Sequence, residues 1–374
     1  MNVLLINPLD ALTDIFLKIS TNLYIITEAK SKLSCYEVNT KKYIFSLKLP
    51  QNKILSIIVK HLLYIYTYLK LANKLHLVII NQETLEPCIT ILLAKLSRKK
   101  IVERIGGSRS YLLFFTIHGP MPLISKIFAI LALASLRFSL NICDAVVLNC
   151  DSLLNENLYR MYSNKIFIIP NPPPDKFYDT FKIIKEYNKR SFIVGYVAAF
   201  SLAKGVASLV RAAKIVIQKN PMVKFLFIGN WRHSHPPFLG SFLKKNVEGY
   251  PNIIFVGPVP HHDVAKYMNE MRLLVLPSYT EGTPKVVLEA MACGTPVLAT
   301  PVGCIPEVLG NGEYGYILSA RDPEVLAREI LKALFNERNE ILSYKIRLHV
   351  KEIYNFEKSL KLWIKLIRRI MSNA

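Results

Sequence analysis

The chain has 374 residues, of which 51% are hydrophobic, and its 48 Lys and Arg against 27 Asp and Glu give a net charge of +21. This length predicts two domains of ~100–200 residues each, and a composition without low-complexity tracts argues against a disordered chain. No paired zinc ligands or aromatic sheet motif accompany the basic charge, so it indicates anionic substrates or an anionic membrane surface rather than nucleic acid.

The first half of the chain alternates short apolar runs with longer helical patterns, which is typical of parallel βαβ units. The expected strands are residues 2–6, 75–81, 100–104, 145–149 and 165–169. Because no basic segment precedes the first apolar run, we expect a buried first strand there rather than a secretory leader.

Two long apolar stretches, residues 54–72 and 122–143, approach the ~20 residues that a membrane-spanning helix needs. Charged residues interrupt both of them, for example Lys60 in the first and Lys126 and Arg137 in the second. We therefore expect packed or interfacial amphipathic helices rather than membrane spans.

The second half repeats the alternation, which predicts a second doubly wound sheet. Its expected strands are residues 192–197, 224–229, 253–257, 273–276 and 296–299. Consecutive prolines at 172–174 and a polar stretch at 185–190 place the domain boundary within residues 176–191.

Residues 281–296 read EGTPKVVLEAMACGTP and carry the strongest functional signal. The apolar run 273–277 before them is typical of a buried parallel strand, and residues 285–292 read as a helix closed by a glycine. Glu281 therefore sits in a strand-to-helix loop, and Glu289 lies about two turns further along. Loop amides and a helix N-terminus favour negative charge, and carboxylates accept hydrogen bonds from hydroxyl groups. The stretch predicts a site for a phosphate that carries polyhydroxylated groups; the alternative is a pair of acids that complement the helix dipole.

This stretch resembles the donor-site signature of retaining glycosyltransferases with the GT-B fold, family 4 (glycosyl transferases group 1). The resemblance continues through residues 297–303, 305–307 and 315–318. It implies an α/β protein of two doubly wound, Rossmann-like domains that face each other across a crevice, with the C-terminal helix crossing back to the N-terminal domain. It also implies transfer of a sugar from a nucleotide diphosphate sugar, with retention of configuration.

The resemblance assigns roles to individual residues of the second domain. Glu281 would bind the sugar hydroxyls at the catalytic centre, and Glu289 would bind the ribose hydroxyls. Gly282, Thr283 and Lys285 would complete the donor-binding loop, which stabilises the departing diphosphate.

Residues 195–205 resemble the second phosphate element of the family, and Lys204 and Gly205 match its lysine and glycine. Its usual Gly-Arg pair is replaced by Ala198 and Ala199, so the bidentate grip of an arginine on the diphosphate is missing. Lys285 of the donor-binding loop is near enough in sequence to substitute for this arginine. The alternative for Lys204 is a solvated surface lysine.

The N-terminal domain matches the family less well, because the usual glycine-rich loop after the first strand is absent. The family's catalytic-site histidine follows a strand in the form Thr-x-His, which residues 116–119 fit, so His118 is the candidate. A rival alignment places residues 101–106 at this point and leaves Ile105 where the histidine belongs.

The last residues, 357–373, form a basic amphipathic helix candidate that contains Trp363. By resemblance it is the helix that crosses back to the N-terminal domain; an ordinary surface helix and a membrane attachment through Trp363 are the alternatives. The expected organisation is an acceptor-side domain at 1–180, a nucleotide-sugar-binding domain at 191–355 and the crossing helix at 356–374.

No Asp-x-Asp sequence occurs in the chain, so we expect no metal at the donor site and no cofactor besides the donor substrate. The six cysteines form no Cys-x-x-Cys pair, which favours a reducing, cytoplasmic setting and indicates no zinc site.

The sequence thus predicts a retaining, metal-independent glycosyltransferase, cytoplasmic and peripheral on an anionic membrane, that uses a nucleotide sugar and a glycan or lipid-linked acceptor. Two alternatives stay open. One is a GT-B-fold protein that binds a glycan or partner without turnover, which the replaced arginine favours. The other is a GT-B-fold epimerase, which would not need the sequence around Glu281.

Overall fold

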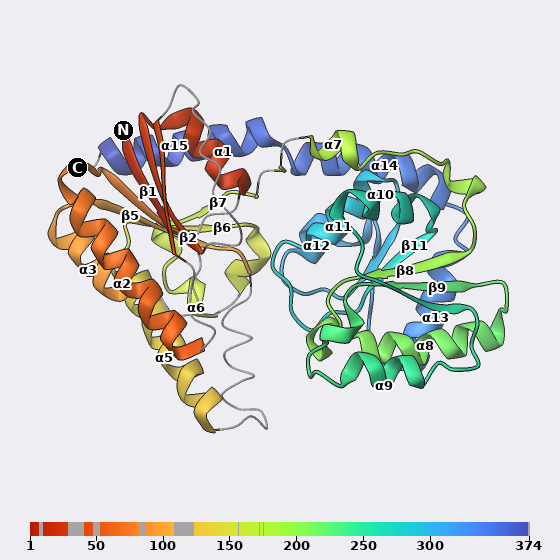
Figure 1. Ribbon diagram of the computed structural model, residues 1–374. Coiled ribbons are helices and arrows are strands. Elements are labelled where there is room, and N and C mark those ends of the chain that lie inside the picture. Colours follow the sequence, from red (N-terminus) through yellow and green to blue (C-terminus); the bar gives the residue numbers. More distant parts are fainter. Residues whose placement is uncertain are drawn as a thin grey trace. The chain divides into compact units, whose positions relative to one another are not determined.

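Parallel β-sheets form the centre of both halves of the chain. The computed structural model describes residues 1–6, 10–28, 41–47, 53–81, 87–107, 123–155, 157–171, 173–174 and 176–372. The chain divides into two units (Figure 1): unit 1 comprises Met1–Pro174 and Asn355–Ala374, and unit 2 comprises Asp175–Tyr354.

Seven strands, all paired in parallel, form the sheet of unit 1 in the order β3-β2-β1-β4-β5-β6-β7. They are β1 (Asn2–Ile6), β2 (Asn22–Glu28), β3 (Lys41–Leu47), β4 (Leu77–Asn81), β5 (Lys100–Ile105), β6 (Ala145–Leu148) and β7 (Ile166–Ile168). Sequence reasoning found five of them to within two residues and missed β2 and β3. Because β2 begins with Asn22 and β3 with two lysines, neither reads as a continuous apolar run.

Helices cover both faces of this sheet, so its strands are apolar on both sides. Val3 and Leu5 of β1 belong to the core cluster that contains residues of α1 (Asp10–Ile19) and α15 (Phe356–Ser372). Leu4 and Ile6 alternate with them and are equally buried. On the other face, α2 (Lys53–Leu71), α3 (Cys88–Leu96) and α5 (Leu123–Ile142) contact the strands (Figure 1).

The C-terminal helix α15 is an integral part of unit 1. Trp363 is 1% exposed and meets the ring of Phe16 edge to face, with 5.2 Å between the ring centroids. Ser359 Oγ donates a hydrogen bond of 2.9 Å to the carbonyl of Pro170. The predicted crossing helix is therefore confirmed, and attachment to a membrane through Trp363 is wrong because the indole is buried in the protein core.

Six parallel strands form the sheet of unit 2 in the order β10-β9-β8-β11-β12-β13. They are β8 (Ile193–Val197), β9 (Lys224–Ile228), β10 (Ile253–Gly257), β11 (Leu273–Leu276), β12 (Val297–Ala299) and β13 (Tyr316–Ile317). The sequence predicted all but β13, which has only two residues. The chain moves outward from β8 to β10 and then returns to β11 on the other side of β8. This reversal is a topological switch point, where ligands bind in open α/β sheets.

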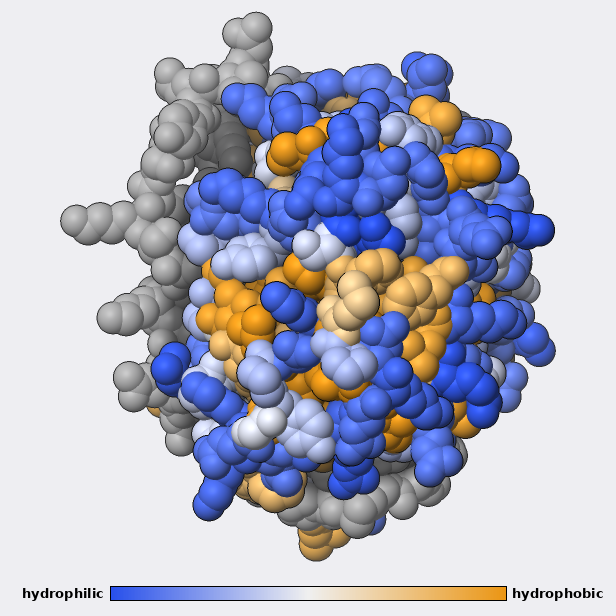
Figure 2. All heavy atoms as spheres, turned by 90° about the vertical axis from the view of Figure 1, so that its right-hand side faces the viewer, coloured by the Kyte–Doolittle hydropathy of each residue, from blue (hydrophilic) through white to orange (hydrophobic). Residues whose placement is uncertain are grey.

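The helices of unit 2 lie on both faces of its sheet (Figure 1). They are α7 (Phe177–Thr180), α8 (Val206–Lys219), α9 (Leu239–Lys245), α10 (His261–Glu270), α11 (Lys285–Ala292), α12 (Ile305–Val308), α13 (Pro323–Leu334) and α14 (Asn339–Ile353). α8 packs against α13, and α11 packs against both α10 and α14. The face of the molecule in Figure 2 is mostly hydrophilic, with hydrophobic side chains gathered near its middle.

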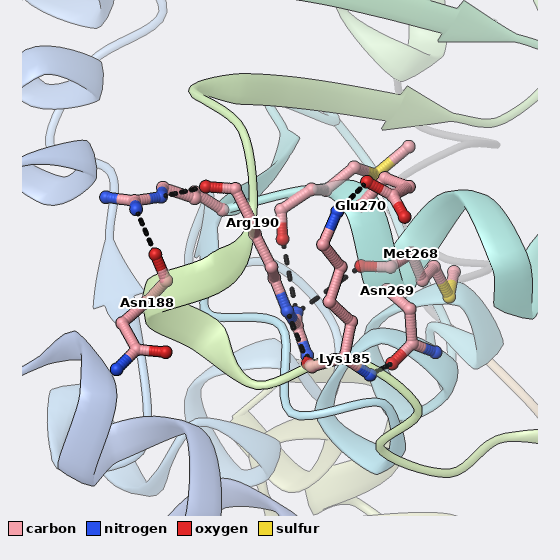
Figure 3. A network of polar contacts seen from close by, with 8 residues as sticks. Lys185, Asn188, Arg190, Met268, Asn269 and Glu270 are labelled. Carbon is pink, nitrogen blue, oxygen red and sulfur yellow. Dashed lines mark hydrogen bonds and ion pairs between the residues drawn. The ribbon is translucent and has the colours of Figure 1, made fainter.

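The buried guanidinium of Arg190 joins several segments of unit 2 (Figure 3). It donates hydrogen bonds to Thr295 Oγ1 and to five backbone carbonyls, those of Lys185, Met268, Met271, Cys293 and Gly294, at 2.8–3.4 Å. Burial lowers the pKa of this guanidinium to about 10. Lys185 forms an ion pair with Glu270 at 2.6 Å. The polar stretch before β8 is thereby fixed to α10 and to the end of α11.

We expect Trp363→Ala to lower the free energy of unfolding by ~3–5 kcal/mol, because it leaves a cavity in the core of unit 1. Urea denaturation monitored by circular dichroism measures this. Lys361→Ala, on the exposed side of the same helix, is the matched control and should change stability little. Equal midpoints for the two variants would contradict the packing of α15 in unit 1.

Candidate functional site

The loops that follow β8 and β11 touch each other at the switch point of unit 2. The N–H of Tyr279 donates a hydrogen bond of 2.8 Å to the carbonyl of Ala203. Gly205 has a positive φ of 68°, and a Cβ at this position would lie 2.1 Å from the carbonyl oxygen of Pro277. Only glycine allows both the left-handed backbone and this close approach. The glycine predicted from the sequence therefore sets the distance between the two loops.

An ion pair joins these loops across the switch point. Lys204 Nζ lies 2.7 Å from Glu281 Oε1, and Ser278 Oγ donates to the same oxygen at 2.7 Å. The side chain of Glu281 is 9% exposed and that of Lys204 is 29% exposed. Lys204 is therefore more than a solvated surface lysine. A nearly buried carboxylate with a charged partner and a hydroxyl donor is held in one orientation.

The loop after β12 supports the main chain around Glu281. A Cβ on Gly303, whose φ is +57°, would lie 2.3 Å from the carbonyl oxygen of Glu281. The N–H of Cys304 donates to the carbonyl of Gly282 at 3.1 Å, and Thr283 Oγ1 lies 3.8 Å from the sulfur of Cys304. Gly282 and Thr283 are thus fixed against a second loop rather than free in solvent.

Arg321, which follows β13, fixes the other end of the same loop. Its Nε and one terminal nitrogen donate to the carbonyl of Ser278 at 3.1 and 3.0 Å, and its guanidinium lies 4.4 Å from the ring centroid of Tyr279. Sequence reasoning missed both Arg321 and Ser278. No motif signal marks Arg321, because its role depends on a loop that is distant in the sequence.

Helix α11 begins at Lys285, so its first N–H groups lie directly after the Gly282–Thr283 segment. Lys285 is exposed, and among the described residues no carboxylate forms an ion pair with it. Its charge adds to the positive end of the helix dipole. The arrangement can accept an anion at this end of the helix.

Glu289 lies one turn inside α11 and is 6% exposed. Its Oε1 lies 2.8 Å from Nε2 of His261, the first residue of α10, whose side chain is 67% exposed. The sequence did not identify His261. In the described part of the chain, the carboxylate has one side-chain partner, the exposed His261, which a hydroxyl-bearing ligand can replace or join.

The backbone at the two replaced positions is tightly packed. The hydroxyl of Tyr196 donates to the carbonyl of Ala199 at 2.8 Å, and burial raises the pKa of this phenol. A Cβ on Gly229, at the end of β9, would lie 2.1 Å from the carbonyl oxygen of Ala198. The loop after β8 keeps a fixed path without the arginine that the resemblance leads one to expect.

The structure thus brings Lys204, Gly205 and Glu281 together. Gly282 and Thr283 lie in the same loop, and Lys285 and Glu289 lie on the helix that follows it. The catalytic candidate His118 lies outside the described residues. Ile105, which the rival alignment places at the histidine position, is the last residue of β5 and is fully buried. Within the ranges that the structure describes, no group of three His, Cys, Asp or Glu residues could hold a metal ion.

Comparison with known proteins agrees with this geometry. Residues 178–349, nearly all of unit 2, match the family "Glycosyl transferases group 1". The capsular polysaccharide biosynthesis glycosyltransferase CapM of Staphylococcus aureus is 30% identical over 42% of this chain and 42% of its own length. The N-acetyl-alpha-D-glucosaminyl L-malate synthase of Bacillus anthracis is 31% identical over 60% of this chain and 59% of its own length. The matches thus span about half of these relatives.

Solved structures resemble the whole chain. A sucrose-phosphate synthase from Thermosynechococcus elongatus has a TM-score of 0.76 at 16% identity, with 100% of both chains covered. Anabaena HepE in complex with UDP has a TM-score of 0.72 at 14% identity, with 99% of this chain and 100% of that chain covered. The predicted fold class, a GT-B protein of two Rossmann-like domains, is confirmed.

We expect Gly205→Ala to destabilise unit 2 more than Gly249→Ala does. Both glycines have positive φ, but a Cβ at Gly249 meets nothing within 4 Å. The control variant carries only the strain of a left-handed residue, ~1–2 kcal/mol. Gly205→Ala adds the overlap with Pro277, a further ~1–3 kcal/mol. Urea denaturation midpoints compare the two, and equal midpoints would refute the close contact between the loops.

Proposed function

We propose that the protein is a retaining, metal-independent glycosyltransferase that moves a sugar from a nucleotide diphosphate sugar to an acceptor. The observation that carries this proposal is the contact of Lys204 and Glu281 at the switch point, directly before the N-terminus of α11. This contact brings a cation and a carboxylate together in the loop that leads into a helix N-terminus. That combination suits a ligand that is both an anion and a polyol.

In the proposed reaction, positive charge is fixed where the diphosphate leaves. Lys204, Lys285 and the first N–H groups of α11 would stabilise the negative charge that develops on the leaving phosphate. Lys204 and the helix N–H groups are already oriented by the fold, so they would need little reorganisation during the reaction. Lys204 would exchange part of its contact with Glu281 for a phosphate oxygen.

The two carboxylates would bind the two sugars of the donor. Glu281, held by Lys204 and Ser278, would accept hydrogen bonds from hydroxyls of the transferred sugar. Glu289 would accept hydrogen bonds from the ribose hydroxyls, with His261 displaced or retained at its other oxygen. His118 remains the proposed catalytic-site residue of unit 1.

The proposed donor and acceptor classes draw on the relatives. Anabaena HepE is described in complexes with UDP and with UDP-glucose, so a uridine diphosphate sugar is the first donor to test. Relatives are named for capsular polysaccharide and for O-antigen synthesis, which supports a glycan acceptor. With the net charge of +21, we propose a lipid-linked or membrane-held acceptor, a cytoplasmic location and peripheral contact with an anionic membrane.

A second candidate function is binding of a glycan or partner without turnover. Ala199 favours it, because the arginine that grips the diphosphate is absent. Hydrolysis and transfer assays with a panel of nucleotide sugars distinguish the two candidates. Turnover of any donor supports the enzyme, whereas nucleotide binding without turnover of any donor supports the binding protein.

We expect Glu289→Ala to weaken binding of UDP by roughly ten- to a hundredfold. Hydrogen bonds to a charged group contribute ~1.5–3 kcal/mol, and the ribose would lose such an acceptor. Isothermal titration calorimetry measures the affinity. Glu270→Ala, which removes a half-exposed carboxylate of α10 paired with Lys185, is the control and should bind normally. Unchanged affinity in a folded Glu289→Ala variant would remove Glu289 from the site.

We expect sugar transfer to continue in the presence of EDTA. The reason is that the site presents cationic side chains and helix N–H groups to the diphosphate, without an Asp-x-Asp pair. Initial rates with and without chelator provide the measurement. Loss of transfer with EDTA and its restoration by Mg²⁺ or Mn²⁺ would show that the metal-free proposal is wrong.

A further inference from the structure

Large hydrophobic side chains are exposed on three neighbouring helices of unit 1. Of the twenty-four exposed large hydrophobic residues in the described ranges, twelve lie on α2, α3 and α5. They are Leu55, Ile58, Leu62, Tyr66, Leu69, Ile89, Leu92, Leu96, Leu123, Ile127, Ile130 and Leu131, with exposed fractions of 44–74%. Such a concentration is unusual, because exposed apolar residues normally occur singly.

These residues form one stripe on each helix. On α2 they recur at intervals of three or four residues from Leu55 to Leu69, which keeps them on one side of the helix. The opposite side of α2 is buried through Tyr64 and Tyr68, and that of α5 through Leu136 and Leu140. α3 contacts both α2 and α5 (Figure 1), so the three stripes lie next to one another on the outer side of this helical layer.

The charges on this layer all have one sign. The three helices, of 19, 9 and 20 residues, contain no Asp or Glu. They carry six basic residues: Lys53, Lys60, Lys70, Lys95, Lys126 and Arg137. By helical periodicity Lys70, Lys126 and Arg137 flank the apolar stripes. Lys60 lies on the opposite side of α2, and Lys95 is paired with Asp144 at 3.0 Å. An apolar surface flanked by basic side chains is complementary to an anionic bilayer, where acyl chains contact the apolar part and headgroups contact the cations.

The helices are long enough to span a membrane but are anchored in the fold. Leu55–Lys74 and Ser125–Ile142 satisfy the length and hydropathy of spanning helices, yet 22% and 28% of their windows are buried in the protein. Ser139 Oγ donates to the buried carboxylate of Glu103 on β5 at 2.6 Å. Removing α5 from the sheet would break this contact and expose the core, so these helices fit a position parallel to the membrane plane.

We propose that the outer face of α2, α3 and α5 binds an anionic lipid bilayer and inserts its apolar stripes at the boundary between headgroups and acyl chains. This surface would hold unit 1 on the membrane that carries the acceptor, a role that rests on the proposed function, whereas bilayer binding itself rests only on the three helices. The apolar contact keeps part of the binding at high salt, when the electrostatic part is screened.

Sedimentation with vesicles of equal parts phosphatidylcholine and phosphatidylglycerol tests this surface. Wild type should bind these vesicles more tightly than phosphatidylcholine alone. Leu62→Gln/Ile130→Gln should weaken binding by about tenfold or more, because two inserted side chains become polar. The matched control is Met222→Gln/Leu348→Gln, which changes two somewhat more exposed residues of unit 2 and should bind as wild type does.

Three results with lipid would overturn the proposal. They are no binding of wild type at low salt, equal binding by both double variants, and wild-type protein that resists carbonate extraction as a spanning protein does. Analytical ultracentrifugation without lipid tests the other occupant, a second copy of the chain: a wild-type dimer that the Leu62/Ile130 variant dissociates also overturns it. Calorimetry with UDP is run on every variant. Loss of vesicle binding with intact UDP affinity separates a failure of this surface from a failure of the proposed function.

Discussion

The buried guanidinium of Arg190 organises the end of the unit 2 sheet that lies away from the site. Its hydrogen bonds reach the carbonyls at the ends of α10 and α11 and those of the segments that lead into β8 and β11. The carbonyls of Lys185, Met271 and Cys293 would each cost free energy without a partner, and this one guanidinium satisfies all three. The carbonyl of Met268 also accepts from Thr295 Oγ1. At the opposite end of the sheet, the carboxyl ends of β8 and β11 lead into the loops of the candidate site. The geometry around Glu281 depends on this arrangement, because α11 connects the two ends.

At the carboxyl ends of these strands, close backbone contacts and a few side chains set the shape of the candidate site. Gly205 and Gly303 allow three loops to approach within contact distance, and Arg321 holds the carbonyl of Ser278. Lys204 and Glu281 are paired within this arrangement. An ion pair of this kind keeps both charges oriented at low solvent exposure. In the proposed function, a phosphate would contact the lysine while Ser278 keeps its hydrogen bond to the carboxylate.

The sequence predicted the helices and strands around the candidate site where local patterns suffice. The helix at Lys285–Ala292 follows from an uninterrupted helical run closed by a glycine, and the motif located both glutamates. Contacts between distant segments were not predictable: His261 beside Glu289 and Arg321 above Tyr279 depend on how loops from separate strands meet. β2, β3 and β13 were not predicted. Polar residues at the ends of β2 and β3, and the short length of β13, obscure the apolar pattern of a buried strand. The role of His118 stays a prediction from the motif, because this residue lies outside the described residues.

The two helical layers of unit 1 differ in a way that composition alone does not reveal. On one face of the sheet, α15 returns from the far end of the chain and adds Trp363 to a core cluster that also includes Phe16. Its basic residues lie along the outside of that helix, as in an ordinary amphipathic surface helix. On the other face, α2, α3 and α5 have apolar residues on both their inner and outer sides. Burial against the sheet explains only the inner side. A contact with another apolar medium is the simplest physical reason for the outer side, and the absence of acidic residues from these helices makes an anionic bilayer the medium that fits.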